Sequence, residues 1–188
     1  LIPILSYIFL KGRCSYCKTK IKKFYLFYEI FIGLFTVSFF IAFGVSWVTI
    51  LEYIVCILII IQILLDYRFL LLSTYVSIFI MLLGLGLAFL DNKISIFDSF
   101  MGVCLGYSSL WLINFFFKSV RNKEGIGDGD FIFLAALCSL FGYKMIGPIV
   151  LGASIISLLI FSINSKENKL LPFGAGMGVT GLTIIFTA

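Results

Sequence analysis

Long apolar runs separated by short polar segments make up most of the chain. The runs are continuous and do not alternate apolar with polar residues, so their pattern favours helices over strands. Seven runs predict helices, at about residues 25–44, 48–65, 70–90, 97–117, 131–143, 145–163 and 170–188. The fifth run is short for a membrane span, and such a run also suits a helix half-buried within the protein.

The composition places these helices in a membrane. Of the 188 residues, 62% are hydrophobic and 12% are charged, whereas average globular chains are roughly half apolar and about a quarter charged. Only helices or closed barrels satisfy their backbone groups in hydrocarbon, and the continuous runs exclude a barrel. We therefore predict an all-α, polytopic membrane helix bundle with about seven spans. Because the chain opens at Leu1 without a Met, we expect missing upstream residues and an intact chain of about eight spans.

The basic residues predict how the bundle is oriented. Only Lys93 and Lys144 fall on one side of the predicted topology, and the positive-inside rule assigns the other side to the cytoplasm. That side has twelve of the fourteen Lys and Arg residues: Lys11, Arg13, Lys18, Lys20, Lys22, Lys23, Arg68, Lys118, Arg121, Lys123, Lys166 and Lys169. The net charge of +5 therefore reflects the topology of the chain and predicts no nucleic-acid partner. We expect the protein to lie in the plasma membrane, in contact with lipid. The predicted domains are a basic cytoplasmic segment, residues 1–24, and a transmembrane domain, residues 25–188.

Two carboxylates stand out against this apolar background. Asp66 ends the second predicted span and Asp130 begins the fifth, so both reach the cytoplasmic side at the same depth. Ionisable groups at membrane depth usually mark a function. Two structural alternatives stay open: Asp66 pairs with Arg68, or Asp128 or Asp130 caps the fifth helix. We favour the capping role for Asp128 but not for Asp130.

Glycines precede the second acid. Gly125, Gly127 and Gly129 stand in the stretch directly before Asp130. Glycine permits unusual backbone conformations and close approach of neighbouring chains. The spacing predicts a tightly packed loop that presents an acid at a helix N-terminus, where the helix dipole favours a carboxylate.

Two aspartates in one site have a specific chemical use. Like charges a few ångströms apart do not both ionise easily, so one carboxyl stays protonated while the other activates a water. This is aspartic peptidase chemistry, and it suits a chain that contains no His. A proton- or cation-coupled transporter is the alternative use of the same acids, although no inverted repeat or paired broken helices are visible. A scaffold subunit with ion-paired carboxylates is a third alternative.

Four segments, in family order, resemble the type IV prepilin leader peptidases, which are membrane aspartic peptidases. The Gly-x-Gly-Asp signature has its counterpart in GIGDGDFIFLAAL, and the first catalytic segment in DYRFLLLST. The segment PILSYIFLKGRCSYCKTKIKKFYLFYE resembles the family's cytoplasmic loop, and LPFGAGMGV resembles the start of the family's last helix. The resemblance covers nearly the whole chain.

The resemblance implies a function and its residues. Asp66 and Asp130 would be the catalytic pair, removing a short basic leader from prepilin or pseudopilin precursors after a glycine at the cytoplasmic face. Proteolysis would need no cofactor, and many members also methylate the new N-terminus with S-adenosylmethionine. The Asp-Tyr-Arg and Gly-Asp-Gly-Asp sequences resemble those of Gram-positive members that process competence pseudopilins. The sequence favours no particular oligomeric state.

The chain departs from the family pattern at two places. The family's Pro-Asp or Pro-Asn is Ser73-Thr74, so the turn after Asp66 is expected to differ. The Lys that usually follows the second catalytic Asp by two residues is Ile132. Neither change removes a catalytic carboxylate, but both are expected to alter pocket polarity or substrate preference.

Cys14 and Cys17 form the only cysteine motif. Four thiolates make a closed tetrahedral zinc site, and the family resemblance implies a second Cys-x-x-Cys pair upstream. Zinc binding therefore depends on an upstream pair that this sequence lacks. The alternative is a reduced pair in a basic loop next to anionic headgroups.

Overall fold

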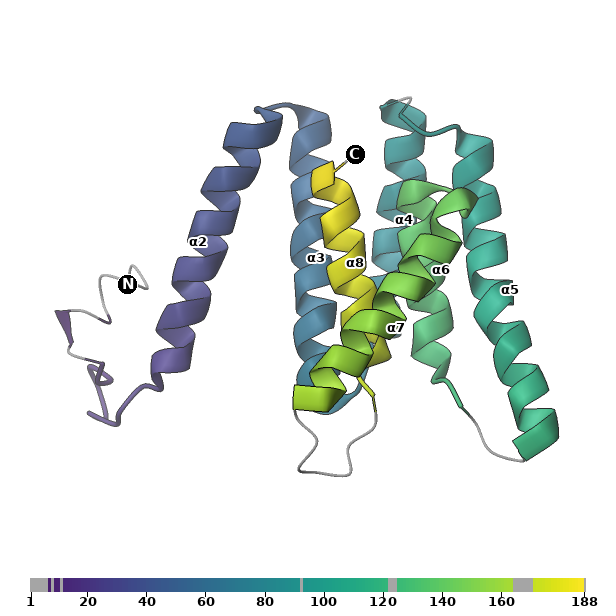
Figure 1. Ribbon diagram of the computed structural model, residues 1–188. Helices are drawn as coiled ribbons and strands as arrows, with labels where there is room; N and C mark the ends of the chain where they lie inside the picture. Colours follow the sequence, from purple (N-terminus) through teal and green to yellow (C-terminus); the bar gives the residue numbers. More distant parts are fainter. Residues whose placement is uncertain are drawn as a thin grey trace. The chain divides into compact units, whose positions relative to one another are not determined.

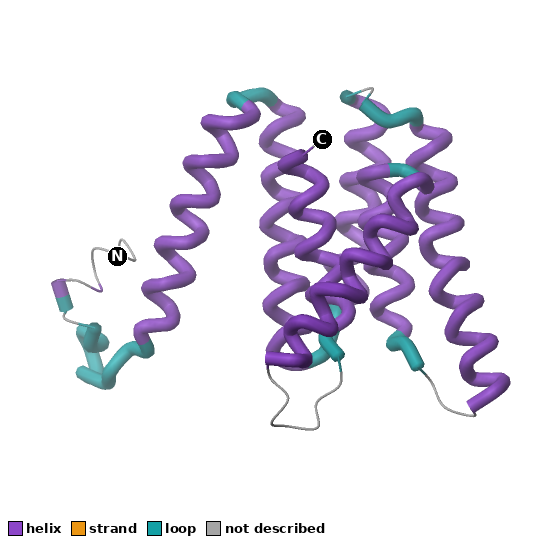
Figure 2. The backbone as a smooth tube through the Cα atoms, viewed as in Figure 1, coloured by secondary structure: helices purple, strands orange, loops and turns teal. Residues whose placement is uncertain are grey.

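Helices account for nearly all regular structure in the chain. The computed structural model describes residues 7, 9–10, 12–91, 93–121, 125–163 and 171–187. Within these ranges Figure 2 shows helices and loops and no strand. The only strand-like feature there is an isolated antiparallel bridge between Arg13 and Lys20. The helices are α2 (Lys23–Phe43), α3 (Trp47–Phe69), α4 (Thr74–Leu90), α5 (Ile96–Arg121), α6 (Asp128–Phe141), the short 3-10 helix η1 (Tyr143–Met145), α7 (Ile146–Ile163) and α8 (Phe173–Thr187).

The helices have the lengths and compositions of a membrane bundle. Four segments are long and apolar enough to cross a membrane, namely α2, α3, α5 and the continuous stretch of η1 and α7. The apolar helices α4 and α8 are shorter. The predicted all-α membrane bundle is confirmed, with one α-helix for each of the seven predicted runs in the described part of the chain.

The junction between α3 and α4 differs from the prediction. The second run was expected to end at 65 and the third to begin at 70, but α3 continues to Phe69 and α4 begins only at Thr74. Leu70 ends α3, because its φ of 53° is left-handed and incompatible with continuing the helix. Asp66 therefore lies within the last turn of α3 instead of beyond it.

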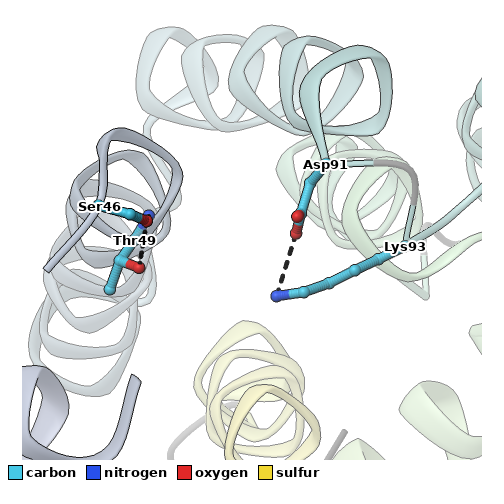
Figure 3. A network of polar contacts seen from close by, with 4 residues as sticks. All are labelled: Ser46, Thr49, Asp91 and Lys93. Atoms are coloured by element: carbon cyan, nitrogen blue, oxygen red, sulfur yellow. Dashed lines mark hydrogen bonds and ion pairs between the residues drawn. The ribbon is translucent and has the colours of Figure 1, made fainter. Parts of the chain in front are cut away.

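The chain divides into two compact units, Leu1–Tyr53 and Ile54–Ala188. In the first unit, α2 is largely exposed and Phe39 is its one buried residue among those described. Phe39 packs against Tyr53, at 5.7 Å between ring centroids. Ser46 caps the start of α3, where its hydroxyl oxygen accepts a hydrogen bond from the Thr49 N–H at 3.1 Å (Figure 3). The exposed apolar surface of α2 suits contact with lipid.

The second unit is organised around α6. This helix packs against α4, α5 and α8, and α7 packs against α8. The buried residues of α6 are Phe131, Phe133, Leu134, Ala135, Ala136, Leu137, Cys138 and Ser139. The expectation that the short fifth run is at least half-buried in protein is therefore confirmed.

Small residues allow the helices around α6 to approach closely. A Cβ atom on Gly102 of α5 would collide with the carbonyl oxygen of Cys138, and one on Gly106 would lie 3.2 Å from the Cα of Ala135. The Ser99 hydroxyl donates a hydrogen bond to the Ser139 carbonyl oxygen at 2.5 Å. Close contact and interhelical hydrogen bonds replace the hydrophobic effect, which does not drive helix association in lipid.

One end of the second unit collects the residues of interest. Figure 1 shows that the C-terminal end of α3 and the N-terminal ends of α4, α6 and α8 lie at the same end of this unit. Asp66 and Asp130 are both at this end, on α3 and α6. The opposite end has the α4–α5 connection, where Asp91 and Lys93 form an ion pair at 3.1 Å (Figure 3).

Candidate active site

Asp66 is buried against the beginning of α8. The side chain is 6% exposed, and its Oδ2 accepts a hydrogen bond from the Ala175 N–H at 2.6 Å. Ala175 lies in the first turn of α8, where backbone N–H groups have no partner within the helix. Asp66 therefore acts as a capping carboxylate for α8, although Ala175 lies 109 residues further along the chain.

Asp130 lies near Asp66 and interacts with it electrostatically. It occupies the first turn of α6 and is half-buried. Its N–H donates a hydrogen bond to the Gly127 carbonyl oxygen at 3.0 Å, which closes the start of the helix. The predicted meeting of these two carboxylates, which are remote in sequence, thus occurs in the second unit.

Asp128 does not cap α6. Gly127 is the N-cap, and no side chain forms a capping hydrogen bond there. The Asp128 side chain is exposed in the first turn. The expected capping role is therefore wrong, and the carboxylate can act on α6 only through the favourable interaction of an acid with a helix N-terminus.

Asn114 of α5 positions the loop that leads into α6. Its Oδ1 accepts hydrogen bonds from the N–H groups of Gly125 at 3.0 Å and Ile126 at 3.2 Å. One side-chain oxygen thus satisfies two consecutive backbone donors. The loop before Asp130 is thereby tied to a neighbouring helix.

At the three glycines before Asp130, the backbone angles do not require glycine, so any requirement comes from the room left for a side chain. None of them has a positive φ, and Gly127 has a φ of −73°. A Cβ on Gly125 would lie 2.8 Å from Cδ1 of Phe117, and one on Gly129 would lie 3.0 Å from Cβ of Leu72. Gly127 has room, since the nearest atom to its Cβ would be Oδ2 of Asp130 at 3.6 Å. The expectation of close packing is confirmed for Gly125 and Gly129.

Gln62 organises the turn after Asp66. It lies one turn before Asp66 and is fully buried. Its amide nitrogen donates hydrogen bonds to the Ser73 carbonyl oxygen at 2.9 Å and the Ser77 hydroxyl at 2.7 Å, and its amide oxygen accepts one from the Ser73 N–H at 3.0 Å. Ser73 is the N-cap of α4 and makes no capping bond with its own side chain. Gln62 therefore fixes the turn at the place where Ser73-Thr74 departs from the family pattern.

Cys14 and Cys17 lie in a tight hairpin of the first unit. The Cys14 N–H donates a hydrogen bond to the Thr19 carbonyl oxygen at 3.0 Å, and Lys18 turns the chain with a φ of 53°. The Thr19 hydroxyl lies 2.9 Å from the Cys17 sulfur and lowers the pKa of this exposed thiol to about 7.

The two thiols do not by themselves make a metal site. A closed zinc site needs four ligands. Within the described residues, no group of three or more His, Cys, Asp or Glu side chains could hold a metal ion. The hairpin thus suits at most half of a tetrahedral zinc site.

Sequence reasoning missed several residues of the site, and only some of them carry a signal that could have revealed them. Gln62 and Asn114 are lone amides within apolar or aromatic runs, and such isolated polar residues could have been flagged as buried hydrogen-bonding groups. Leu72 cannot be distinguished from the leucines beside it. The Ala175 N–H is a backbone group, so residue type does not reveal it.

The geometry suits the activation of a water molecule. Two interacting carboxyls, one buried and one half-buried, lie at one end of a helix bundle. When one of them is ionised and the other protonated, they can hold a water and a carbonyl oxygen together. No His or metal is required for this chemistry.

Comparison with known proteins shows the family to which the chain belongs. The sequence profile of the type IV leader peptidase family matches residues 53–163. A second profile, that of the bacterial peptidase A24 N-terminal domain, matches residues 1–43. No solved structure matches the chain.

Similar curated proteins carry the name prepilin leader peptidase/N-methyltransferase. They include proteins of Dichelobacter nodosus, 31% identical over 199 residues, Neisseria gonorrhoeae, 32% over 192, and Aeromonas hydrophila, 29% over 185. The alignments cover 100%, 100% and 96% of this chain and 66%, 65% and 64% of the respective relatives. The chain therefore spans slightly less than two thirds of their length. Because the first profile spans more than half of the chain, the chain belongs to the type IV leader peptidase family.

Proposed function

We propose that this protein is a membrane aspartic endopeptidase that removes the N-terminal leader from prepilin or pseudopilin precursors. The observation that carries the proposal is the meeting of Asp66 and Asp130, from helices far apart in sequence, at one end of the second unit. Family membership supplies the substrate class, since the relatives are named prepilin leader peptidases. The transporter alternative gains no support from these comparisons.

In the proposed reaction the two carboxyls act as one unit. The ionised carboxyl takes a proton from a water, which attacks the carbonyl carbon of the scissile peptide, while the protonated carboxyl donates a hydrogen bond to the carbonyl oxygen. Breakdown of the tetrahedral intermediate releases the leader and passes a proton to the new amino terminus. The roles belong to the coupled pair and not to either residue separately.

The membrane side and the cofactors belong to the same proposal. The excess of basic residues at the site end favours a cytoplasmic active site in the plasma membrane, close to a basic leader. N-methylation with S-adenosylmethionine is supported by the relatives' name alone. Zinc at Cys14 and Cys17 would need ligands beyond the described residues, so no step of the reaction passes through it. Processing of competence pseudopilins stays a prediction from the motif sequences.

Substitution of the two acids tests the proposal. Membranes containing Asp66→Asn or Asp130→Asn are incubated with a pseudopilin precursor, and the shortened product is followed on gels and by mass spectrometry. Each change removes one acid–base group, so we expect cleavage to fall by about 10²- to 10⁴-fold. Insertion of each variant into the membrane is checked in parallel.

Asp128→Asn is the matched control. It removes the same charge two residues before Asp130, on an exposed side chain, and we expect a milder change, within a few-fold. Full cleavage by either the Asp66 or the Asp130 variant would end the proposal.

A further inference from the structure

Leu72 lies between two glycines that belong to different parts of the site. A Cβ on Gly129 of α6 would lie 3.0 Å from Cβ of Leu72 and 3.5 Å from its carbonyl oxygen. A Cβ on Gly174 of α8 would lie 2.7 Å from Cδ1, 2.9 Å from Cδ2 and 3.0 Å from Cγ of the same leucine. The base of the Leu72 side chain therefore touches α6, and its tip touches α8.

One of these glycines is next to an acid of the site, and the other is next to the residue that donates a hydrogen bond to the second acid. Gly129 directly precedes Asp130, and Gly174 directly precedes Ala175, whose N–H donates to Asp66. A shift of α6 at Gly129 would move the Asp130 carboxyl. A shift of α8 at Gly174 would move the hydrogen-bond donor that holds Asp66.

Leu72 itself is held firmly. It precedes Ser73, whose N–H and carbonyl oxygen both bond to the buried Gln62. Two residues before it, Leu70 has a left-handed backbone with φ of 53°. This conformation is uncommon for a bulky residue and persists only where the surroundings determine it.

We infer that Leu72 is a positioning residue, whose side chain sets the separation of the N-terminal ends of α6 and α8 and thereby aligns Asp66 with Asp130. The inference rests on the proposed function only for its catalytic consequence. The two glycines are required because the leucine occupies the space in which their side chains would stand.

The contacts predict an asymmetry between the two glycines. The atoms facing Gly174 are the end of the Leu72 side chain, so a shorter residue at 72 makes room for a methyl at 174. The atoms facing Gly129 are Cβ and the carbonyl oxygen, which every residue other than glycine retains. Gly174→Ala should therefore be rescued by Leu72→Val, because that pair of changes roughly conserves volume, whereas Gly129→Ala should not.

The first experiment measures cleavage kinetics of the full chain in membranes. Leu72→Ala should lower kcat by about 100-fold, the loss expected when reacting groups move by about 1 Å, with KM within twofold. The spacing between the two limbs of the pH–rate profile should also change, because the repulsion between the two carboxyls depends on the distance between them. Leu71→Ala is the matched control, since the neighbouring Leu71 is 67% exposed, and its kinetics should stay within twofold of the parent.

The second measurement does not depend on activity. Spin labels on Asp128→Cys and Leu171→Cys, both exposed positions, report the separation of α6 and α8 in a chain in which Cys14, Cys17 and Cys104 are replaced by Ser. Leu72→Ala and Gly174→Ala should each broaden or shift the distance distribution. Leu72→Val together with Gly174→Ala should restore the narrow parental distribution.

The outcomes separate the two hypotheses. An unchanged distance distribution in both Leu72→Ala and Gly174→Ala would overturn the positioning role, whether or not the protein cleaves pseudopilins. A second combination of results would also overturn the positioning role. If Leu72→Ala lowers kcat without changing the pH profile, and Leu72→Val does not rescue Gly174→Ala, the leucine serves folding alone. If the parental chain leaves every precursor uncut, the proposed function fails, and the distance measurement still decides the role of Leu72.

Discussion

At the scale of single residues, the site depends on groups that hold the acids as much as on the acids. Asp66 is fixed by a backbone N–H of α8, and the loop before Asp130 is fixed by Asn114. Both arrangements satisfy donors that would otherwise lack partners at the start of a helix or in a partly buried loop. The acids themselves were predictable, because charges at membrane depth are rare. Among their supports, the lone amide of Asn114 could have been flagged, whereas a backbone donor and an ordinary leucine leave no mark in composition.

Asn114 gives a test at this scale. Asn114→Ala removes the acceptor of two N–H groups, which should cost about 1–2 kcal/mol of local stability. Hydrogen exchange at Gly125 and Ile126 should then quicken by about 5- to 30-fold. Asn114→Asp keeps the accepting oxygen and should retain most of the protection, as measured by exchange with mass spectrometry.

A second polar residue on α5 serves as the control. Within the part of the chain that the structure describes, the Ser108 hydroxyl donates to the Leu105 carbonyl oxygen of its own helix, so Ser108→Ala should leave exchange at Gly125 and Ile126 unchanged. Equal exchange in Asn114→Ala and the parent would show that the loop is held by other contacts.

At the scale of elements, hydrophobic pattern predicted the helices well and their ends less well. The boundary errors at α3 and α4 come from Leu70–Leu72, which are as apolar as a membrane helix but form its connection. Hydropathy does not distinguish a leucine that faces lipid from one that ends a helix or separates two others. The burial of α6 was predictable from its shortness, whereas its packing partners were not.

Two glycines of α4 test how closely that helix must approach α6. A Cβ on Gly84 would collide with the Ser139 hydroxyl and lie 3.1 Å from the Ser139 carbonyl carbon, whereas a Cβ on Gly86 would meet nothing within 4 Å. Gly84→Ala should therefore lower the free energy of unfolding by about 1–3 kcal/mol through overpacking. Gly86→Ala should raise it by roughly 0.5–1 kcal/mol, because alanine favours the helix.

The buried thiols of Cys56 and Cys138 provide the readout. They react with a thiol-specific dye only when the protein opens, so denaturant curves of dye reaction in detergent compare the two variants with the parent. Similar destabilisation by both changes would mean that backbone propensity, and not the α4–α6 contact, governs the result.

At the scale of the whole molecule, the charges predict one orientation. Within the second unit, Arg68, Lys118 and Arg121 lie at the ends of α3 and α5 on the same side as the acids. At the opposite end, Lys93 forms an ion pair with Asp91. Lys144 is the other basic residue at that end among those described. Of the basic residues that the structure describes in this unit, three lie at the site end and two at the opposite end, so the positive-inside rule favours a cytoplasmic site end.

This orientation is tested with a membrane-impermeant maleimide on whole cells. One variant keeps Cys17 as its single exposed cysteine, and another has Cys14, Cys17 and Cys104 replaced by Ser and carries Lys144→Cys. We expect Lys144→Cys to label in intact cells and Cys17 to label only after the membrane is opened, since the positive-inside rule keeps the basic hairpin in the cytoplasm. Thiol exposure does not limit either position, because Cys17 and Lys144 are both exposed. The reversed labelling pattern would place Asp66 and Asp130 at the outer face, away from the cytoplasm where the basic leader of a precursor is expected. It would therefore rule out cleavage at the cytoplasmic face.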